Sequence, residues 1–324
     1  MSSIPTIPTR TLGKTGIQVT PIGLGVMELS GGGGMLGRAF PVIPQAEKNA
    51  IIQAALDGGI NWFDTAEIYG GGVSERSLAA GLKAAGKRPG DVVVATKWFP
   101  LFRTAGNIPR TISDRLRFLD GFPIDLYYIH QPTSFSSPEA EMNAMADLVE
   151  AGKIRSVGVS NFSPDRMRRA HAALLKRGLP LAANQVRYSL LHRKIETDGT
   201  LETARELGVT ITAYTPLASG LLTGKYHKNP ELLKNKSFIW RSRMQRQLEA
   251  SRPLVAALEE IAVKYQVTAA QVALNWLIWF SGEVVVTIPG ATKARQAAES
   301  AGAMQFRLSD AELARLDELS RSFR

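Results

Sequence analysis

The stretch INWFDTAEIYGGG, residues 60–72, begins as a strand and then changes character. Ile60, Trp62 and Phe63 are apolar residues of the kind that a buried strand needs, and the run stops at an acid, Asp64. A phenol, Tyr69, follows five residues later beside three glycines. Because unpaired polar groups are costly in a packed core, a carboxylate and a phenol at the end of a core strand indicate an edge with a function.

Similar short runs recur along the chain, each rich in Val, Ile and Tyr and separated from the next by a longer amphipathic segment. The runs are apolar on both faces, as buried parallel strands are. Eight such runs can be recognised, at residues 21–27, 60–66, 91–98, 124–130, 154–161, 181–188, 209–216 and 283–290.

Helix patterns fill most of the intervals between these runs. Several are bounded by residues typical of helix starts and ends, with Ser74 and Ser163 at starts and Gly58, Gly86, Gly152 and Gly178 at ends. Eight strand–helix units in one chain predict an α/β fold of the (β/α)8 TIM barrel type. A doubly wound open sheet is the competing arrangement.

Two segments fall outside the repeat. Residues 9–20 precede the first strand and predict a small N-terminal β-hairpin that turns at residues 14–16. Residues 217–252 form a long polar and basic insertion after strand seven, too long for an idle loop in a compact domain. No linker interrupts the pattern, so residues 1–324 are predicted to form a single barrel domain.

Composition narrows the class of protein. The 324 residues are 44% hydrophobic and 21% charged, as in ordinary globular proteins, and include no cysteine. Disulfides and thiolate metal sites are therefore excluded, and no metal is expected. The N-terminus lacks the pattern of a secretory signal, and the longest apolar stretch, VALNWLIWF, is too short to span a bilayer. We expect a cytoplasmic protein without a membrane partner.

The net charge of +10 raises the question of nucleic acid binding. The basic residues are scattered, and their densest cluster, RSRMQRQ at 241–247, has no interleaved aromatic residues. We interpret the cluster as a solvated helix face and expect no nucleic acid partner. The charge suits attraction of a small molecule that carries phosphate.

In TIM barrels, chemistry is located at the carboxyl ends of the strands. The polar residues at the ends of strands two to seven form a consistent set that would point into one mouth: Asp64, Lys97, His130, Ser160, Asn161, Gln185 and Tyr214.

Four of the residues at the strand ends suggest a reaction. A tyrosine with an ordinary pKa of about 10 gives up its proton poorly near neutral pH. The ammonium of Lys97 beside Tyr69 would lower the pKa of the phenol, and Asp64 would supply the counter-charge that a buried lysine needs. His130 could hydrogen-bond a substrate oxygen and orient it. Together the four groups predict a phenol tuned to protonate an oxyanion.

The sequence resembles the aldo-keto reductases. The segments FDTAEIYG, ATKW, DLYYIHQP, GKIRSVGVSNF, NQVRYS, YTPLASGLLTGKY and IPGATKARQ are similar to motifs of that family and occur in the same order. The resemblance runs from about Arg10 to the C-terminus. ASGLLTGKY is typical of the branch that includes potassium-channel β-subunits and related bacterial and plant reductases.

The resemblance implies NADPH bound in an extended conformation across the barrel mouth, with hydride transfer to a carbonyl carbon. It implies that Tyr69 is the acid, that Lys97 and Asp64 tune it, and that His130 orients the substrate. Ser160, Asn161 and Gln185 would hold the carboxamide, Tyr214 would stack on the nicotinamide, and Thr292 and Lys293 would hold the 2′-phosphate. Further cofactor contacts implied by the family are Leu217, Ser219, Gly220, Leu221, Lys225, Gly290, and, near the adenine, Gln296 and Glu299.

Two details differ from the family pattern or go beyond it. The family often has Glu-Asn near the adenine, where this chain has Glu299 and Ser300. Arg295 is added to the phosphate site because it lies beside Lys293 near the start of the last barrel helix, where the helix dipole already favours anions.

The function predicted is reduction of aldehydes or ketones to alcohols by an NADP-dependent oxidoreductase. The substrate would be a small carbonyl compound. An NADP(H)-sensing regulatory subunit similar to the channel β-subunits is the alternative, and near-stoichiometric retention of NADP with slow turnover would favour it. A phosphate-sugar isomerase or lyase on the same barrel is a third possibility that no motif supports.

Overall fold

The computed structural model describes the backbone of residues 7–33, 41–233 and 238–324. It describes the side chains of the same residues except those of residues 233–244. Its main sheet has eight parallel strands in the order β10-β9-β8-β7-β6-β5-β4-β3, so strands that are consecutive in the chain are neighbours in the sheet. The strands are β3 (Leu24–Gly25), β4 (Trp62–Asp64), β5 (Val93–Trp98), β6 (Leu126–Ile129), β7 (Ser156–Ser160), β8 (Leu181–Arg187), β9 (Thr210–Tyr214) and β10 (Val285–Thr287).

The two edge strands of this sheet meet and close it. Parallel bridges pair Ile22 with Thr287 and Gly25 with Gly290, and the Gly25 N–H donates to Pro289 O at 3.0 Å. Gly23 allows this seam to form, because a Cβ at that position would overlap the indole of Trp62. Closure confirms the predicted barrel and excludes the doubly wound open sheet.

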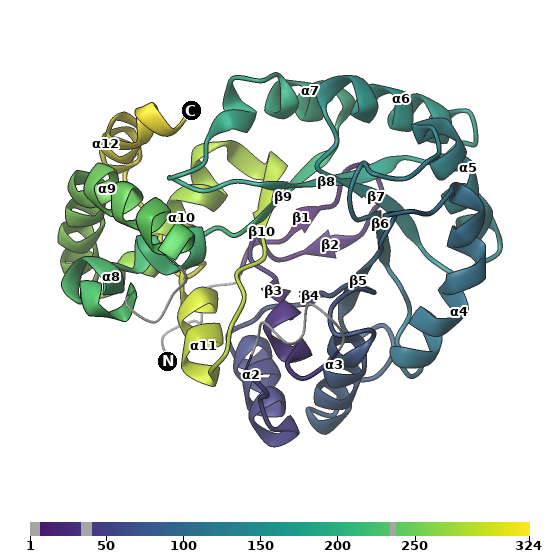
Figure 1. Ribbon diagram of the computed structural model, residues 1–324, viewed down its shortest axis with the longest axis horizontal. Coiled ribbons are helices and arrows are strands. Elements are labelled where there is room, and N and C mark those ends of the chain that lie inside the picture. Colours follow the sequence, from purple (N-terminus) through teal and green to yellow (C-terminus); the bar gives the residue numbers. More distant parts are fainter. Residues whose placement is uncertain (1–6, 34–40, 234–237) are drawn as a thin grey trace.

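Helices surround the strands, as Figure 1 shows, and their apolar faces form the outer core. The helices that follow strands are α2 (Gln45–Asp57), α3 (Val73–Ala84), α4 (Ile108–Phe118), α5 (Pro138–Glu150), α6 (Pro164–Leu175), α7 (Thr200–Leu207) and α11 (Ala294–Gly302). Helices α10 (Ala269–Phe280) and α12 (Asp310–Ser320) complete this layer, and short 3-10 turns are η1 (Met27–Ser30), η2 (Ala105–Asn107), η3 (Lys194–Glu196), η6 (Gly282–Val284) and η7 (Arg321–Phe323).

The N-terminal hairpin is confirmed. Strands β1 (Arg10–Thr11) and β2 (Gln18–Val19) pair antiparallel, and the Leu12 N–H donates to Ile17 O at 2.9 Å. Leu12, Ile17 and Val19 are buried in a second, inner core together with Trp62 and Tyr128. The hairpin therefore fills one end of the barrel, which leaves the other end for chemistry.

The insertion that follows β9, the seventh strand of the barrel, is helical rather than a loop. It contains η4 (Ala218–Thr223), α8 (Lys225–Lys228), η5 (Pro230–Leu233) and then α9 (Phe238–Tyr265). Helix α9 continues past the predicted boundary at residue 252, because Leu254, Leu258 and Ile261 recur at helix spacing and are buried. Most side chains of the basic cluster at 241–247 lie outside the described residues.

One of the predicted helix starts is wrong. Ser163 caps α6 as predicted, and its hydroxyl accepts from the Arg166 N–H. Ser74 instead lies inside α3, where its hydroxyl donates to Val26 O at 2.7 Å. The chain reaches α3 through Gly72 at φ 89, a conformation that glycine adopts without strain, so no side-chain cap is used there.

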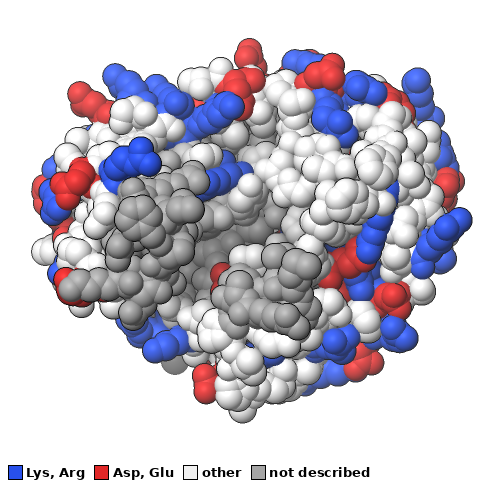
Figure 2. All heavy atoms as spheres, in the orientation of Figure 1, with Lys and Arg blue, Asp and Glu red and all other residues white. Residues whose placement is uncertain are grey.

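Figure 2 shows that one face of the molecule is hollowed near its middle and that Lys and Arg are interspersed with Asp and Glu around it. This distribution agrees with the scattered charge seen in the sequence. Among the described helices, none combines the length and the apolar character that a membrane span requires.

Candidate active site

The strand register brings the predicted catalytic side chains to one end of the barrel. Asp64 ends β4 and is paired with Ala95 of β5, and Lys97 follows two residues further along β5. His130 comes directly after β6, and its N–H donates to Trp98 O at 3.0 Å. Because residues two apart in a strand point to the same face, these side chains converge inside the mouth.

A buried ion pair joins Lys97 and Asp64. The Lys97 side chain has no exposed surface and that of Asp64 has 2%. Lys97 Nζ also donates to Thr65 O at 2.8 Å, and Gln185 Nε2 donates to Asp64 Oδ2 at 2.9 Å. Burial raises the pKa of Asp64 and lowers the pKa of Lys97, while the ion pair opposes both shifts. The extra hydrogen bonds supply the compensation that a buried pair requires.

Tyr69 lies beside this ion pair. Its hydroxyl is 3.5 Å from Lys97 Nζ, which lies 5.0 Å from the centre of its ring. Burial raises the pKa of Tyr69 well above its ordinary value, and the charges of Asp64 and Glu28 act in the same direction. The expected lowering of the phenol pKa by Lys97 is therefore not seen, because Asp64 largely neutralises the ammonium and burial prevails. The phenol keeps its proton at neutral pH, as an acid must.

His130 lies on the other side of Tyr69. The two rings meet edge to face with centroids 5.6 Å apart, and Phe99 packs against His130 at 5.8 Å. Burial, followed by the charge of Lys97, lowers the pKa of His130 well below its ordinary value. Its Nδ1 is shielded from solvent and has no hydrogen-bond partner among the described residues. A neutral imidazole has one donor and one acceptor nitrogen, so the other ring nitrogen, Nε2, can bind a polar ligand atom.

The predicted nicotinamide-binding residues form one hydrogen-bonded chain. Tyr214 donates to Asn161 Oδ1 at 3.1 Å, and Asn161 Nδ2 donates to Ser160 Oγ at 3.1 Å. The Ser160 hydroxyl donates to Gln185 O at 2.8 Å, and the Gln185 side chain reaches Asp64. Asn161 has a φ of 58°, an uncommon conformation for a residue with a side chain. The structure thus connects these four residues to the ion pair.

The segment after β9 has strained backbone. Thr215, Ala218 and Ser219 all have positive φ, at 53°, 48° and 55°, and Gly220 follows at 90°. A left-handed conformation costs about 1–3 kcal/mol for each residue other than glycine, and such strain is concentrated at ligand-binding sites. Leu217 O accepts from the Gly220 N–H at 2.9 Å, Leu221 is buried, and the Lys225 side chain lies against Gly220.

The predicted phosphate and adenine residues surround the start of α11. Gln296 Oε1 accepts from the Thr292 N–H at 2.8 Å and from the Thr292 hydroxyl at 3.0 Å. Lys293 and Arg295 are exposed, and neither takes part in an ion pair between described residues. Glu299 accepts from the Thr268 hydroxyl at 2.6 Å, so its carboxylate is held toward the start of α10.

Two groups of residues were missed by sequence reasoning. Glu67 accepts from the Phe99 N–H at 3.0 Å and from Arg103 at 2.7 Å, and it ties the segment before Tyr69 to the loop after β5. Arg115 of α4 lies 3.6 Å from the Glu67 carboxylate and 3.1 Å from that of Glu75. No local pattern identifies Arg115, because the contacts join distant parts of the chain.

The second group that sequence reasoning missed is a single residue, Glu28 of η1, which faces Gly290 across the barrel seam. The sequence contained a signal for Glu28, because this acid directly follows the first strand run, residues 21–27. Asp64 similarly comes directly after the apolar residues of the second run.

Two exposed aromatic side chains lie beyond Phe99 on the loops that follow β5 and β6. Phe102 and Phe135 are 78% and 72% exposed, with ring centroids 6.4 Å apart. The Phe135 N–H donates to Arg103 O at 2.9 Å, which joins the loops after β5 and β6. An exposed aromatic pair on anchored loops offers apolar surface on the His130 side of the site.

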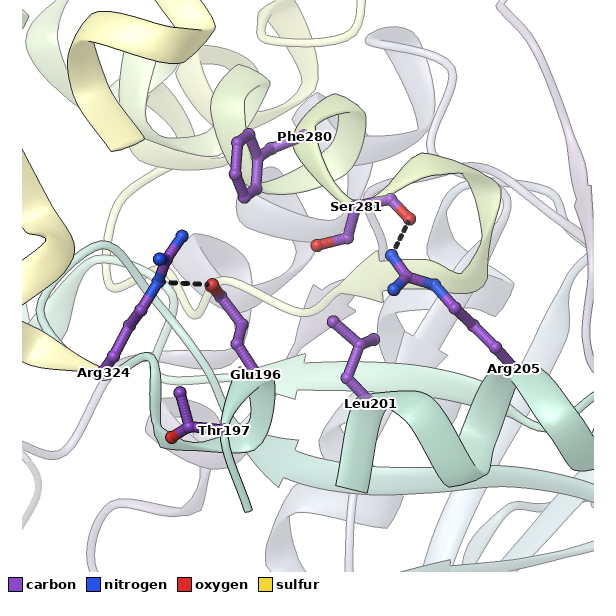
Figure 3. Close-up of a pocket in the computed structure, with 7 residues that line it drawn as sticks. All are labelled: Glu196, Thr197, Leu201, Arg205, Phe280, Ser281 and Arg324. Atoms are coloured by element: carbon purple, nitrogen blue, oxygen red, sulfur yellow. Dashed lines mark hydrogen bonds and ion pairs between the residues drawn. The ribbon is translucent and has the colours of Figure 1, made fainter. Parts of the chain in front are cut away.

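A separate pocket of about 390 Å³ lies on the outer wall, between α7 and the end of α10. Figure 3 shows Arg205 bonded to Ser281 and Arg324 bonded to Glu196 across it. Arg324 also pairs with Asp317, so this wall is held together by ion pairs. None of the predicted catalytic or cofactor residues lines this pocket.

Comparison with known proteins gives consistent matches over nearly the whole chain. The model of the Aldo/keto reductase family matches residues 21–321. Aldo-keto reductase str7 of Strobilurus tenacellus is 35% identical over 326 residues, covering 97% of this chain and 92% of the relative. Aldo-keto reductase yakc [NADP(+)] of Schizosaccharomyces pombe is 32% identical over 328 residues, covering 96% and 91%. The glycerol dehydrogenase structure from Gluconobacter oxydans has a TM-score of 0.79 at 28% identity, covering 100% and 97%.

Proposed function

Because the chain belongs to the aldo/keto reductase family, we propose that it uses NADPH to reduce aldehydes or ketones, with Tyr69 as the general acid. The observation that carries this proposal is the position of the Tyr69 hydroxyl, 3.5 Å from Lys97 Nζ and beside the neutral ring of His130. A chain without cysteine suits a reducing compartment, and we place the protein in the cytoplasm.

The residues present fit a nicotinamide dinucleotide. Asn161 and Tyr214 lie where a carboxamide and a flat ring could be held, and the segment 215–220 contains residues with positive φ, a backbone conformation that occurs in anion-binding loops. Thr292 and Lys293 at the start of α11 would hold the 2′-phosphate, with Gln296 and Glu299 near the adenine. When bound, NADPH supplies the hydride. The name of the Schizosaccharomyces pombe relative specifies NADP(+), which supports this choice.

The protein's own residues would perform the proton transfer. Tyr69 donates its proton to the substrate oxygen as negative charge develops there. The phenolate that remains is stabilised by the ammonium of Lys97, which Asp64 and Thr65 O hold in place. The His130 ring can hydrogen-bond the same substrate oxygen and orient it, through Nε2 because Nδ1 is shielded from solvent. The exposed aromatic pair beyond Phe99 favours substrates with an apolar group next to the carbonyl.

The first expected result concerns turnover. The purified protein should oxidise many equivalents of NADPH when it is given simple aliphatic and aromatic aldehydes and ketones, at rates typical of enzymes, about 1 to 1,000 per second. Loss of NADPH absorbance measures this directly. Release of a single equivalent of product with NADP retained on the protein would instead favour the sensor alternative.

A second expected result concerns cofactor choice. Lys293→Glu should reduce the preference for NADPH over NADH by tenfold or more, since a charge-assisted hydrogen bond contributes about 1.5–3 kcal/mol. Use of NADH should change little, because NADH has no 2′-phosphate. A basic residue at a helix start opposes the helix dipole, which indicates that Lys293 is there for an anion. The measurement is the ratio of kcat/KM for the two cofactors.

Two further variants complete that test. Lys153→Glu makes the same charge change on the turn between α5 and β7, at the opposite end of the barrel, and should leave the ratio unchanged. Arg295→Glu tests the second phosphate contact that we propose. Equal kcat/KM for NADH and NADPH in the wild type would overturn this assignment. A ratio of kcat/KM that Lys293→Glu left unchanged would overturn it too.

A further inference from the structure

Glu28 is an acid in the barrel mouth that the proposed catalytic set does not use. It belongs to η1, directly after β3, and its side chain lies across the seam at which β3 meets β10. A Cβ at Gly290 would overlap both carboxyl oxygens of Glu28, so the carboxyl lies against the backbone of Gly290. The carboxyl therefore lies between the residues proposed for catalysis and those proposed for the 2′-phosphate.

One oxygen of the Glu28 carboxyl lacks a hydrogen-bond partner among the described residues. Although the residue is partly exposed, its Oε2 is shielded from solvent and has no hydrogen-bond partner among the described residues. No ion pair between described residues includes Glu28. Burial raises the pKa of Glu28 to about 7, and its own backbone N–H opposes that shift only in part. A buried oxygen without a partner makes the ionised carboxylate costly at this place, so the neutral acid is the cheaper form.

A dinucleotide at this seam would bring further negative charge. Two like charges at a shielded site repel strongly, and the cheaper outcome is protonation of the carboxyl. We propose that Glu28 takes up a proton when the dinucleotide binds and then donates a hydrogen bond from its carboxyl group to an oxygen of that ligand. This inference rests on the proposed function for the presence of the cofactor, and it adds a cofactor-binding residue that couples affinity to pH.

The groups that face Glu28 do not share this behaviour. From the segment after β4, Tyr69 keeps its proton because its pKa is raised well above the ordinary value. Asp64 is held in its ion pair with Lys97, and Tyr214 of β9 also has a raised pKa. The exposed cations Lys293 and Arg295 at the start of α11 form no ion pair with Glu28 among the described residues, and the guanidinium of Arg76 in α3 lies over the Phe118 ring. Among the described groups beside the seam, Glu28 is the one whose pKa is raised to about 7.

The direction of the pH effect follows from linkage. In the free protein the carboxyl is protonated below about pH 7 and ionised above it. The bound form has the higher pKa, so binding is unaffected at low pH and weakens as pH rises. The dissociation constant for NADPH should therefore increase about tenfold between pH 6 and pH 8. The 2′-phosphate, with a second pKa of about 6, gives a trend of opposite sign, and NADH lacks it.

Glu28→Gln tests the effect of ionising this carboxyl alone. Glutamine keeps the shape of the glutamate side chain and a hydrogen-bond donor, but it cannot ionise. The variant should bind NADPH about tenfold more tightly than the wild type at pH 8, with no weakening above pH 7. Glu75→Gln is the matched control, because burial also raises the pKa of Glu75 to about 7 but its carboxylate lies behind the barrel wall against Arg115. Glu75→Gln should keep the wild-type slope.

The measurement is binding rather than activity. Quenching of tryptophan fluorescence gives the dissociation constants of NADPH and NADH for the three proteins between pH 6 and pH 9 at constant ionic strength. Calorimetry of the wild type at pH 8, in buffers of different ionisation enthalpy, should show uptake of close to one proton per cofactor, and Glu28→Gln should show almost none. This second readout stands even if the Glu75 variant fails to fold.

The outcomes separate this inference from the function on which it rests. Binding of NADPH without a pH slope, or without proton uptake, overturns the role of Glu28 and leaves the reductase proposal intact. The same slope in wild type and Glu28→Gln also overturns that role. Failure of the wild type and of Glu28→Gln to bind either dinucleotide at pH 6 overturns the reductase proposal itself, and this inference with it.

Discussion

Tyr69→Phe should lower kcat for carbonyl reduction by about 100- to 10,000-fold, the range that a positioned general acid contributes. Phenylalanine keeps the ring that packs edge to face on His130 and removes the hydroxyl that lies 3.5 Å from Lys97 Nζ. The site therefore keeps its shape and loses its proton donor. Affinity for NADPH should stay within about twofold of wild type, because an interaction made only in the transition state is lost.

The experiment measures kcat by NADPH absorbance and the dissociation constant of NADPH by fluorescence. Tyr265→Phe is the matched control, since Tyr265 donates to Glu312 on the outer helices and lies outside the mouth. If Tyr69→Phe retained most of its turnover number, another group would have to be the acid.

Lys97→Met should lower kcat on the same scale, and the structure changes the reason for this expectation. The sequence suggested that Lys97 lowers the pKa of the resting phenol, whereas burial raises that pKa. The role that remains for Lys97 is in the transition state, where Tyr69 becomes a phenolate and the ammonium stabilises the new charge. Methionine keeps the length and apolar stem of lysine and removes that charge.

Loss of Lys97 also affects stability, which must be separated from catalysis. Removing one partner of a buried ion pair typically costs about 3–5 kcal/mol, because the other charge is left uncompensated. The double variant Asp64→Asn/Lys97→Met removes both charges and should recover much of the free energy of unfolding, measured in urea, without recovering activity. A stable Lys97→Met protein with wild-type kcat would show that the ammonium is not needed.

Much of the candidate site could be predicted because its residues lie at the ends of strands. Asp64, Lys97 and His130 each follow or end an apolar run, and in a barrel such positions meet at one mouth. The N-terminal hairpin was also predictable, since its turn residues are local. The start of α3 was not, because a seryl hydroxyl at position 74 can cap a helix or bond to a distant carbonyl, and only the fold supplies Val26 O.

The contacts that tune the site could not be predicted. Glu67, Arg103 and Arg115 come from three separate segments, and no spacing in the chain shows that they meet. The pKa of Tyr69 depends on how much solvent the folded mouth excludes and on which charges surround the ring, neither of which the sequence contains. The acid after the first strand run was visible in the sequence, but the contact of Glu28 with Gly290 was not, because it forms only where the first and last strands of the barrel meet.

The sequence by itself determined the repeating alternation of buried strands and amphipathic helices, the hairpin that precedes them and the identity of the polar residues at the strand ends. These follow from local hydrogen bonding and from the burial of apolar side chains, whose periodicity is written along the chain. The tertiary structure decided which polar groups became neighbours, which were cut off from water and which were left without a partner. Electrostatic energies depend on distances and exposure across the closed barrel, so the buried Asp64–Lys97 pair, the protonated Tyr69 and the unpaired carboxyl of Glu28 emerge only when the strands meet.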